Sequence, residues 1–308
     1  MREGIDNALT IDVEDYFQVA ALAEAVKYDD WPSMEYRVEA NTDRLLRLFD
    51  NASVKATFFI LGWVAERSPQ LVRHIANAGH EVASHGYSHQ LIYNQTPAVF
   101  HEETRRSKAI LEDILSVGVT GYRAASYSIT NQSRWALDIL AEEGFTWDSS
   151  IFPVHHDRYG MPGTPRWPHR LTTDKGYELA EFPLSTLKFP GYTLPIAGGG
   201  YFRLFPYWFS RWGLGSINRQ GQPFVFYLHP WEVDPGQPRL DVKWLSRFRH
   251  YNNLDVCEKR LSRLLGHFRF TTMSNVLRNQ GVLEHNSDEL SSHAIKCNVV
   301  PGTALKTS

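Results

Sequence analysis

The feature that most constrains the fold of this 308-residue chain is a repeated alternation of short apolar runs with helix-like segments. The apolar runs, each typical of a buried strand, cover residues 8–13, 56–61, 81–83, 119–122, 224–228 and 268–270. Segments with apolar residues three and four apart fall between them, at residues 38–49, 69–79, 97–115, 131–143 and 255–265. This alternation predicts an α/β fold with a mainly parallel sheet, either open or closed into a barrel.

The middle of the chain interrupts the alternation. Residues 153–221 are rich in proline and glycine and include three consecutive glycines at 198–200. We expect long loops around the functional site there, rather than a separate domain. Residues 284–308 are polar and aperiodic, which predicts a disordered tail. The sequence therefore predicts one domain over residues 1–283.

Composition narrows the class of partner. The chain has 32 Lys and Arg against 34 Asp and Glu, a formal charge of −2, so its overall field does not favour nucleic acid or an anionic membrane. A hydrophobic content of 43% is enough for a large core. The 14 Tyr and 9 Trp suit stacking against sugar faces, and ordinary core packing explains them equally well.

Cysteine usage and the chain ends bear on the compartment. The two cysteines are Cys257 and Cys297, and the second lies in the polar tail, so a disulfide framework is not expected. The N-terminal residues lack the apolar core of a signal peptide, and no run of about 18 apolar residues could span a bilayer. We expect a cytoplasmic protein.

The first strand ends in the acidic sequence Asp12-Val13-Glu14-Asp15. In parallel α/β folds the carboxyl ends of the strands carry the active site. Strand alternation places Asp12 and Glu14 on one face, where carboxylates repel one another unless a cation lies between them. The alternative is a solvated acidic turn.

Two histidines follow the strand at residues 81–83. His85 and His89 can reach one ion if the chain coils after the strand, which gives a two-histidine, one-carboxylate set with positions open for water and substrate. The spacing alone is a weak signal, and its place at a strand end strengthens it.

Three further strand ends carry polar groups. Arg123 could hold a carboxylate ionised and oriented, or form a surface salt bridge. His229 follows a very apolar strand, where it could act as a general acid or be a hydrogen-bonded structural histidine. Asp148 either supports the site or caps a turn.

In order, these segments resemble the polysaccharide deacetylases of the NodB-homology type, carbohydrate esterase family 4. The likeness is closest to the branch found beside exosortase-linked exopolysaccharide gene clusters. It extends from about residue 8 to 280. The matching segments are residues 10–17 (TIDVEDYF), 84–89 (SHGYSH), 121–128 (GYRAASYS), 147–153 (WDSSIFP), 198–203 (GGGYFR) and 227–232 (YLHPWE).

The resemblance implies a single-domain, distorted (β/α)7-type barrel and a hydrolase with one divalent metal ion. That ion is usually Zn²⁺, with Co²⁺, Ni²⁺ or Mn²⁺ as alternatives. By motif position, Asp12 is the general base, Arg123 tethers it, His85 and His89 are metal ligands, and His229 is the general acid.

The resemblance leaves the carboxylate ligand open. The common motif has two adjacent aspartates, whereas this chain offers Glu14, with Asp15 as the alternative. Ala125 stands where the family usually has proline, in the loop whose backbone N–H near Ser126 would bind the oxyanion. Predicted substrate contacts are Ser126, Tyr127 and Trp231, and further candidates are His156, Arg158, Tyr159 and Tyr201.

The implied reaction removes N-acetyl groups from amino sugars of an exopolysaccharide or of its lipid-linked precursor. The expected partner is an N-acetylated glycan, with peripheral membrane contact through a lipid-linked substrate and no nucleic acid. Two alternatives remain: an O-acetyl esterase or other amidase with the same metal site, and a catalytically silent sugar-binding barrel, for which Ala125 is the only hint. The sequence does not identify the sugar, the metal or the oligomeric state.

Overall fold

A nine-stranded sheet organises the computed structural model, which describes residues 4–156 and 159–284. The strand order is β10-β1-β2-β3-β4-β5-β7-β6, with β11 also paired to β1. Every pairing is parallel except the one between β6 and β7. The strands are β1 (Asp6–Val13), β2 (Thr57–Ile60), β3 (Glu81–Ser84), β4 (Gly121–Tyr122), β5 (Trp147–Asp148), β6 (His169–Thr172), β7 (Glu178–Glu181), β10 (Val225–Leu228) and β11 (Arg269–Thr271).

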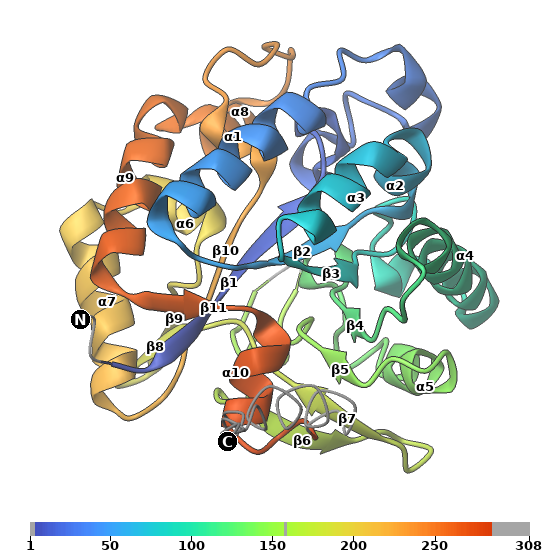
Figure 1. Cartoon of the computed structure of the whole chain (residues 1–308), viewed down its shortest axis with the longest axis vertical. Helices are drawn as coiled ribbons and strands as arrows, with labels where there is room; N and C mark the ends of the chain where they lie inside the picture. The colour runs from blue at the N-terminus through green and yellow to red at the C-terminus, as the bar shows by residue number, and fades with distance from the viewer. Residues whose placement is uncertain (1–3, 157–158, 285–308) are drawn as a thin grey trace, which may run out of the picture.

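Helices surround the curled sheet, as Figure 1 shows. They are α1 (Val38–Ala52), α2 (Gly62–Arg67), α3 (Pro69–Asn77), α4 (Pro97–Leu115), α5 (Trp135–Glu142), α6 (Gly199–Leu204), α7 (Tyr207–Arg219), α8 (Trp244–Tyr251), α9 (Leu254–His267) and α10 (Met273–Asn279). Short 3-10 helices are η1 (Tyr16–Gln18), η2 (Ala20–Leu22), η3 (Tyr28–Ser33), η4 (Ile92–Asn94), η5 (Ala125–Tyr127) and η6 (Pro230–Val233). The predicted fold class, a distorted α/β barrel, is confirmed.

Strand alternation in β1 separates the core from the site. Leu9, Ile11 and Val13 belong to the hydrophobic cluster between sheet and helices. Thr10 and Asp12 therefore take the opposite face, inside the barrel, and both are buried. The inner cluster, to which α10 contributes, includes Ala8, Phe59, Ala83, Trp147, Phe152, Met273 and Leu277. Core packing of both faces thus fixes the direction in which the acidic end of β1 points.

The prediction of long loops over residues 153–221 is wrong. This segment adds β6 and β7 to the sheet, and it contains α6, α7 and a separate hairpin of β8 (Thr186–Phe189) and β9 (Tyr192–Pro195). Strands of four residues are too short to show a clear period. The apolar face of α7 was obscured by Gly213 and Gly215, which are unusual inside a helix.

A glycine closes the barrel wall beside β10. Gly198 has φ of 135° and forms an isolated parallel bridge with Tyr227. A Cβ at this position would lie 2.1 Å from the Tyr227 carbonyl oxygen, so only glycine allows the close approach. A single bridge, rather than a regular strand, thus pairs with this side of β10.

Within residues 4–156 and 159–284, no helix combines the length and apolar character needed to cross a membrane. Cys257 is buried and not in a disulfide. Cys297 and nearly all of the predicted tail lie outside the described residues.

Candidate active site

The predicted residues converge on one pocket at the carboxyl ends of β1, β3, β4 and β10. The pocket has a volume of about 320 Å³. Its lining includes most of the predicted site residues: Asp12, Glu14, His85, His89, Ser126, Tyr127, His229 and Trp231. The sheet brings them together because the carboxyl ends of its parallel strands meet at this edge.

Glu14, His85 and His89 form a group suited to a cation. Their ligand atoms all lie within 4.8 Å of one another, and the carboxylate and His85 are buried. His89 Nε2 lies 2.7 Å from Glu14 Oε2, yet that oxygen accepts no aligned hydrogen bond from any described residue. Two such atoms in contact without hydrogen-bond alignment suit a shared ion, and two imidazoles with one carboxylate suit a divalent metal.

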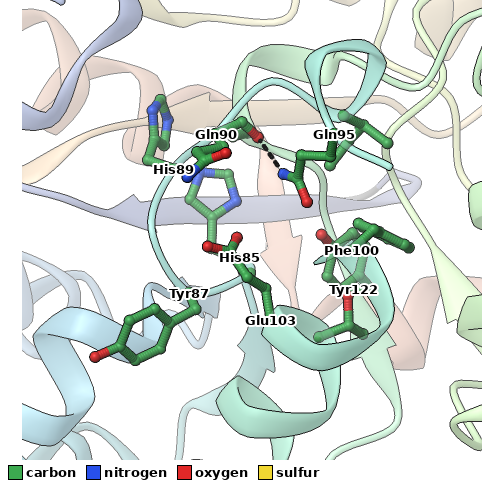
Figure 2. Close-up of a pocket in the computed structure, with 12 residues that line it drawn as sticks. His85, Tyr87, His89, Gln90, Gln95, Phe100, Glu103 and Tyr122 are labelled. Atoms are coloured by element: carbon green, nitrogen blue, oxygen red, sulfur yellow. Dashed lines mark hydrogen bonds between the residues drawn. The ribbon is translucent and has the colours of Figure 1, made fainter. Parts of the chain in front are cut away.

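Local backbone geometry brings the two histidines onto one side of the loop after β3. Gly86 and His89 have φ of 74° and 55°, so the chain coils at once after the strand. Figure 2 shows this loop above α4, where Gln95 Nε2 donates to the Gln90 carbonyl at 3.1 Å. The prediction that His85 and His89 reach one ion required the chain to coil in this way after the strand.

One ring nitrogen of His85, Nδ1, is engaged in a hydrogen bond. Its Nδ1 lies 2.8 Å from the Arg123 carbonyl oxygen, which can only accept, so Nδ1 carries the proton and Nε2 is free. Burial lowers the pKa of His85 to about 4 and keeps the imidazole neutral, the form that binds a metal. Burial opposes ionisation of Glu14, but the imidazoles of His89 and His229 outweigh it and lower its pKa to about 2.

Asp15 does not join this group, and its prediction as the alternative ligand is not supported. Its carboxylate accepts backbone N–H bonds from Tyr16 at 2.8 Å, Arg37 at 2.6 Å and Val38 at 2.8 Å. The side chain therefore fixes the chain after β1 and the start of α1. Both Glu14 and Asp15 follow the end of β1, and these bonds hold the Asp15 carboxylate at the start of α1, whereas Glu14 lies beside the imidazoles.

We expect added Zn²⁺ to raise the unfolding midpoint of the wild-type protein by several degrees, because an ion that binds only the folded state stabilises it. Glu14→Gln and His85→Ala should lose this increase. Asp15→Asn is the matched control: its metal-free midpoint should fall, since capping bonds are lost, but its zinc-induced shift should persist. Differential scanning fluorimetry measures both. A zinc shift lost in Asp15→Asn would contradict this ligand set.

Asp12 is held by Arg123 inside the barrel. Arg123 Nη1 donates to Asp12 Oδ1 at 2.7 Å and to Thr10 Oγ1 at 2.8 Å. Its Nη2 donates to Ser149 Oγ at 3.0 Å, and both charged side chains are buried. The Tyr127 hydroxyl donates to Asp12 Oδ2 at 3.3 Å. The carboxylate is thereby oriented, with one oxygen directed toward the pocket.

His229 is oriented by two residues to which the sequence assigned no role. Its Nδ1 donates to Glu232 Oε1 at 2.7 Å, and Arg203 Nε donates to Glu232 Oε2 at 2.6 Å. Glu232 and Arg203 are almost completely buried. His229 Nε2 consequently faces the pocket, 3.4 Å from Glu14 Oε1 and 3.9 Å from Asp12 Oδ2.

The charge state of His229 follows from these neighbours. Burial alone would lower its pKa, but the carboxylates of Glu14 and Glu232 outweigh burial and raise the pKa to about 9. The imidazole is protonated at neutral pH, as a proton donor requires. The spacing of His229 and Glu232 on one 3-10 turn could have suggested this pair, but nothing in the sequence connects Arg203 to it.

The predicted oxyanion loop has an unusual backbone. Ser126 and Tyr127 have φ of 50° and 54°, consecutive left-handed residues that lie beside the pocket. The loop is fixed by hydrogen bonds: Ala124 N–H donates to Ser150 Oγ at 2.8 Å, and Ser128 Oγ donates to the Ala125 carbonyl at 2.6 Å. These hydrogen bonds hold the loop in place although Ala125 stands where the family usually has proline.

The predicted substrate contacts lie around this pocket. Trp231 stacks between His229 and His250, at 5.2 and 4.2 Å between ring centroids, and its Nε1 donates to Glu14 Oε1 at 3.3 Å. Tyr159 lines the pocket, and its hydroxyl lies 3.3 Å from that of Tyr201. The other two candidates are His156, whose ring stacks on Tyr159, and Arg158, which lies outside the described residues.

Two buried carboxyls, Asp148 and Glu181, interact electrostatically with Arg123. Asp148 accepts hydrogen bonds from the Ser150 hydroxyl at 2.6 Å and backbone at 3.0 Å, and it interacts with Glu181. Ile151 N–H donates to Glu181 Oε1 at 3.2 Å. Burial raises the pKa of both carboxyls, and the charge of Asp148 raises that of Glu181 further. Asp148 thus caps a local turn at Ser150, whose hydroxyl in turn accepts from the Ala124 N–H of the loop after β4.

This pair makes the stability of the fold pH-dependent. The folded state keeps protons that the unfolded chain releases above the ordinary glutamate pKa, so stability falls as pH rises through that range. Glu181→Gln imitates the protonated side chain. We expect its unfolding midpoint to exceed that of the wild type at pH 8 and the advantage to shrink at pH 5. The exposed Glu178→Gln, on the same strand, should show no such trend, and equal destabilisation of Glu181→Gln at both pH values would contradict the assignment.

The sequence model of the polysaccharide deacetylase family matches residues 24–145, the region that contributes His85, His89 and Arg123. Over these residues the chain is similar to the polysaccharide deacetylases of the NodB-homology type. A second family model, a domain of unknown function called DUF3473, matches residues 149–278. His229, Glu232 and Arg203 all come from this second region. The pocket is therefore built from both matched regions.

Curated relatives align with part of this chain. The peptidoglycan deacetylase of Helicobacter pylori is 31% identical over 39% of the chain and 39% of its own length. The peptidoglycan-N-acetylglucosamine deacetylase of Bacillus cereus is 31% identical over 37% of the chain and 40% of its own length. The chain thus spans about two fifths of the length of the curated relatives it matches.

Solved structures share the fold of the deacetylase domain. A protein of Pseudomonas aeruginosa PAO1 described as a polysaccharide deacetylase superposes with a TM-score of 0.59 at 15% identity, over 89% of this chain and 90% of that one. The PuuE allantoinase superposes with a TM-score of 0.59 at 15% identity, over 89% of each chain.

Proposed function

We propose that this protein is a metal-dependent hydrolase that removes N-acetyl groups from amino sugars of a polysaccharide. The observation that carries the proposal is the convergence, in one pocket, of the group Glu14, His85 and His89 with Asp12 and His229. Relatives named as deacetylases of peptidoglycan and of chitooligosaccharides support the class of substrate. Residues 1–283 would act as one catalytic domain, since both matched regions contribute to the sheet and to the pocket.

A divalent ion bound by Glu14, His85 and His89 would supply Lewis-acid activation of water and of the acetyl carbonyl. Asp12, held by Arg123, would accept the proton of the attacking water. The backbone N–H groups of the loop at Ser126 would donate to the oxyanion that develops on the acetyl carbonyl. The base and one metal ligand would thus come from the end of β1, and the other ligands and the oxyanion donors from the loops after β3 and β4.

His229 would complete the reaction by protonating the leaving amine. Its Nδ1 bond to Glu232 directs Nε2 into the pocket, and the protonated state at neutral pH gives it a proton to donate. Without that proton the amine would be a poor leaving group. The acid and the base would thus act from β10 and β1 on the same pocket.

The expected substrate is an exopolysaccharide or its lipid-linked precursor. The sequence resemblance to the exosortase-linked branch supports this choice. Zn²⁺ is the expected ion, since two imidazoles and one carboxylate suit it well.

The test is release of acetate by the zinc-loaded protein from N-acetylated and from O-acetylated glycans, with a cyclic amide as a third substrate. We expect turnover of the N-acetylated glycan only. Preference for the O-acetyl ester would favour an esterase, and opening of the ring would favour an amidase such as the structurally similar allantoinase. Glycan binding without acetate release would favour a silent sugar-binding barrel and reject the proposal.

A further inference from the structure

Helix α8 presents an apolar face to solvent. Trp244, Leu245 and Phe248 are 75%, 49% and 42% exposed. The rings of Trp244 and Phe248, one helical turn apart, stack at 5.7 Å between centroids with planes at 15°. His250, on the opposite side of the helix, is buried against Trp231. The inward side of α8 therefore holds the helix to the domain, and the outward side exposes apolar surface.

Cationic side chains border this apolar face. Residues 239–249 contain Arg239, Lys243, Arg247 and Arg249 but a single acidic residue, Asp241. Arg247 is exposed and forms no ion pair with a described residue, and Lys243 pairs with Glu24 in a fully solvated contact that contributes little. The whole chain has a formal charge of −2, so this positive charge is a local concentration.

The start of α8 lies next to the wall of the catalytic pocket. Ala21 of η2 lines that pocket and also a hollow of about 460 Å³ formed with Val242, Lys243 and Ser246 at the start of α8. At the end of the helix, Arg203 donates to the His250 carbonyl at 2.9 Å. Both ends of α8 are thus connected to groups that build the site.

We propose that α8 docks on the surface of an anionic phospholipid membrane and so places the mouth of the pocket beside it. Trp and Phe are favoured at the interface between headgroups and acyl chains, and Leu adds buried apolar area. Each nearby Lys or Arg is attracted to anionic headgroups, and the attraction weakens with salt. A helix of eight residues gives a weak, reversible and salt-sensitive attachment, suited to a substrate that the membrane carries.

A second exposed aromatic surface allows a control for non-specific hydrophobic binding. On α7, Trp208 and Trp212 are 68% and 45% exposed and lie beside Arg211. The hollow that they line includes His267 and Phe268, which immediately precede β11. That hollow therefore reaches the amino ends of the strands, away from the catalytic edge. The α7 surface has similar chemistry at a different place and serves as a matched control.

The experiment is co-sedimentation of the purified protein with vesicles of phosphatidylcholine alone or mixed with phosphatidylglycerol. We expect binding to the mixed vesicles that weakens with added salt. Trp244→Ser with Phe248→Ser should reduce it by about tenfold or more. Lys243→Gln with Arg247→Gln should abolish the preference for the mixed vesicles. Trp208→Ser with Trp212→Ser should bind as the wild type does.

No binding of the wild type to the mixed vesicles would overturn the proposal, and so would a loss of binding in the α7 variant. Unchanged binding in the α8 variant would overturn it as well. Because every substituted side chain is solvent-exposed, unfolding midpoints should match the wild type, and circular dichroism checks this. Vesicle binding does not depend on catalysis. A protein that does not bind vesicles could therefore still be a deacetylase, and the two proposals are tested separately.

Discussion

Asp12→Asn should lower the turnover of an N-acetylated glycan by about 10² to 10⁴-fold. The amide oxygen of asparagine can still accept the Arg123 N–H bond, but the side chain can no longer take a proton from water. The buried Arg123 also loses its counter-charge, so the unfolding midpoint should fall. Rates of acetate release per folded molecule, with the folded fraction measured by circular dichroism, separate the two effects.

Asp15→Asn is the matched control for Asp12→Asn. The two aspartates lie three residues apart and both are buried, but Asp15 accepts only backbone N–H bonds. Its substitution should cost about 1 kcal/mol of stability and leave turnover per folded molecule nearly unchanged. Equal losses of turnover in both variants would mean that the proton-accepting role of Asp12 is wrong.

His229→Ala should lower turnover of the same substrate by on the order of 10²-fold or more, because the leaving amine then departs without a proton. The decisive measurement uses a second substrate, an acetate ester with a nitrophenol leaving group. Nitrophenolate leaves without protonation, so the defect of His229→Ala should shrink sharply on this ester. The defect of Asp12→Asn should not, since attack by water still needs a base.

The comparison between substrates distinguishes an acid from a structural histidine. If His229 only held the pocket together, its removal would impair both substrates equally. Its paired residue Glu232 is less suited to the experiment, because its substitution leaves the buried Arg203 without a partner and lowers stability by several kcal/mol. An equal defect of His229→Ala on the amide and on the activated ester would therefore reject the acid role.

Much of the barrel could be predicted from the sequence because strands such as β1, β2 and β10 are buried on both faces. The run at residues 224–228 is almost wholly apolar and appears as β10, and the helix at residues 97–115 appears as α4 with the same bounds. The region at residues 153–221 could not be predicted in this way. Its strands are short, and their partners are distant in the sequence. Their formation therefore depends on strand pairing and not on a local pattern of residues.

The sequence by itself determined which residue types end the strands, and therefore that Asp12, His85, Arg123 and His229 would meet. The physical reason is that parallel strands align their carboxyl ends at one edge of the sheet, whatever their separation along the chain.

Only the tertiary structure decided how those residues are used. The backbone N–H bonds that Asp15 accepts hold it at the start of α1 and leave Glu14 as the carboxylate beside the imidazoles. The approach of α6 to η6 brought Arg203 onto Glu232, which orients His229. Both outcomes depend on which donors and charges become neighbours when distant segments pack. A linear pattern of residue types does not contain that information.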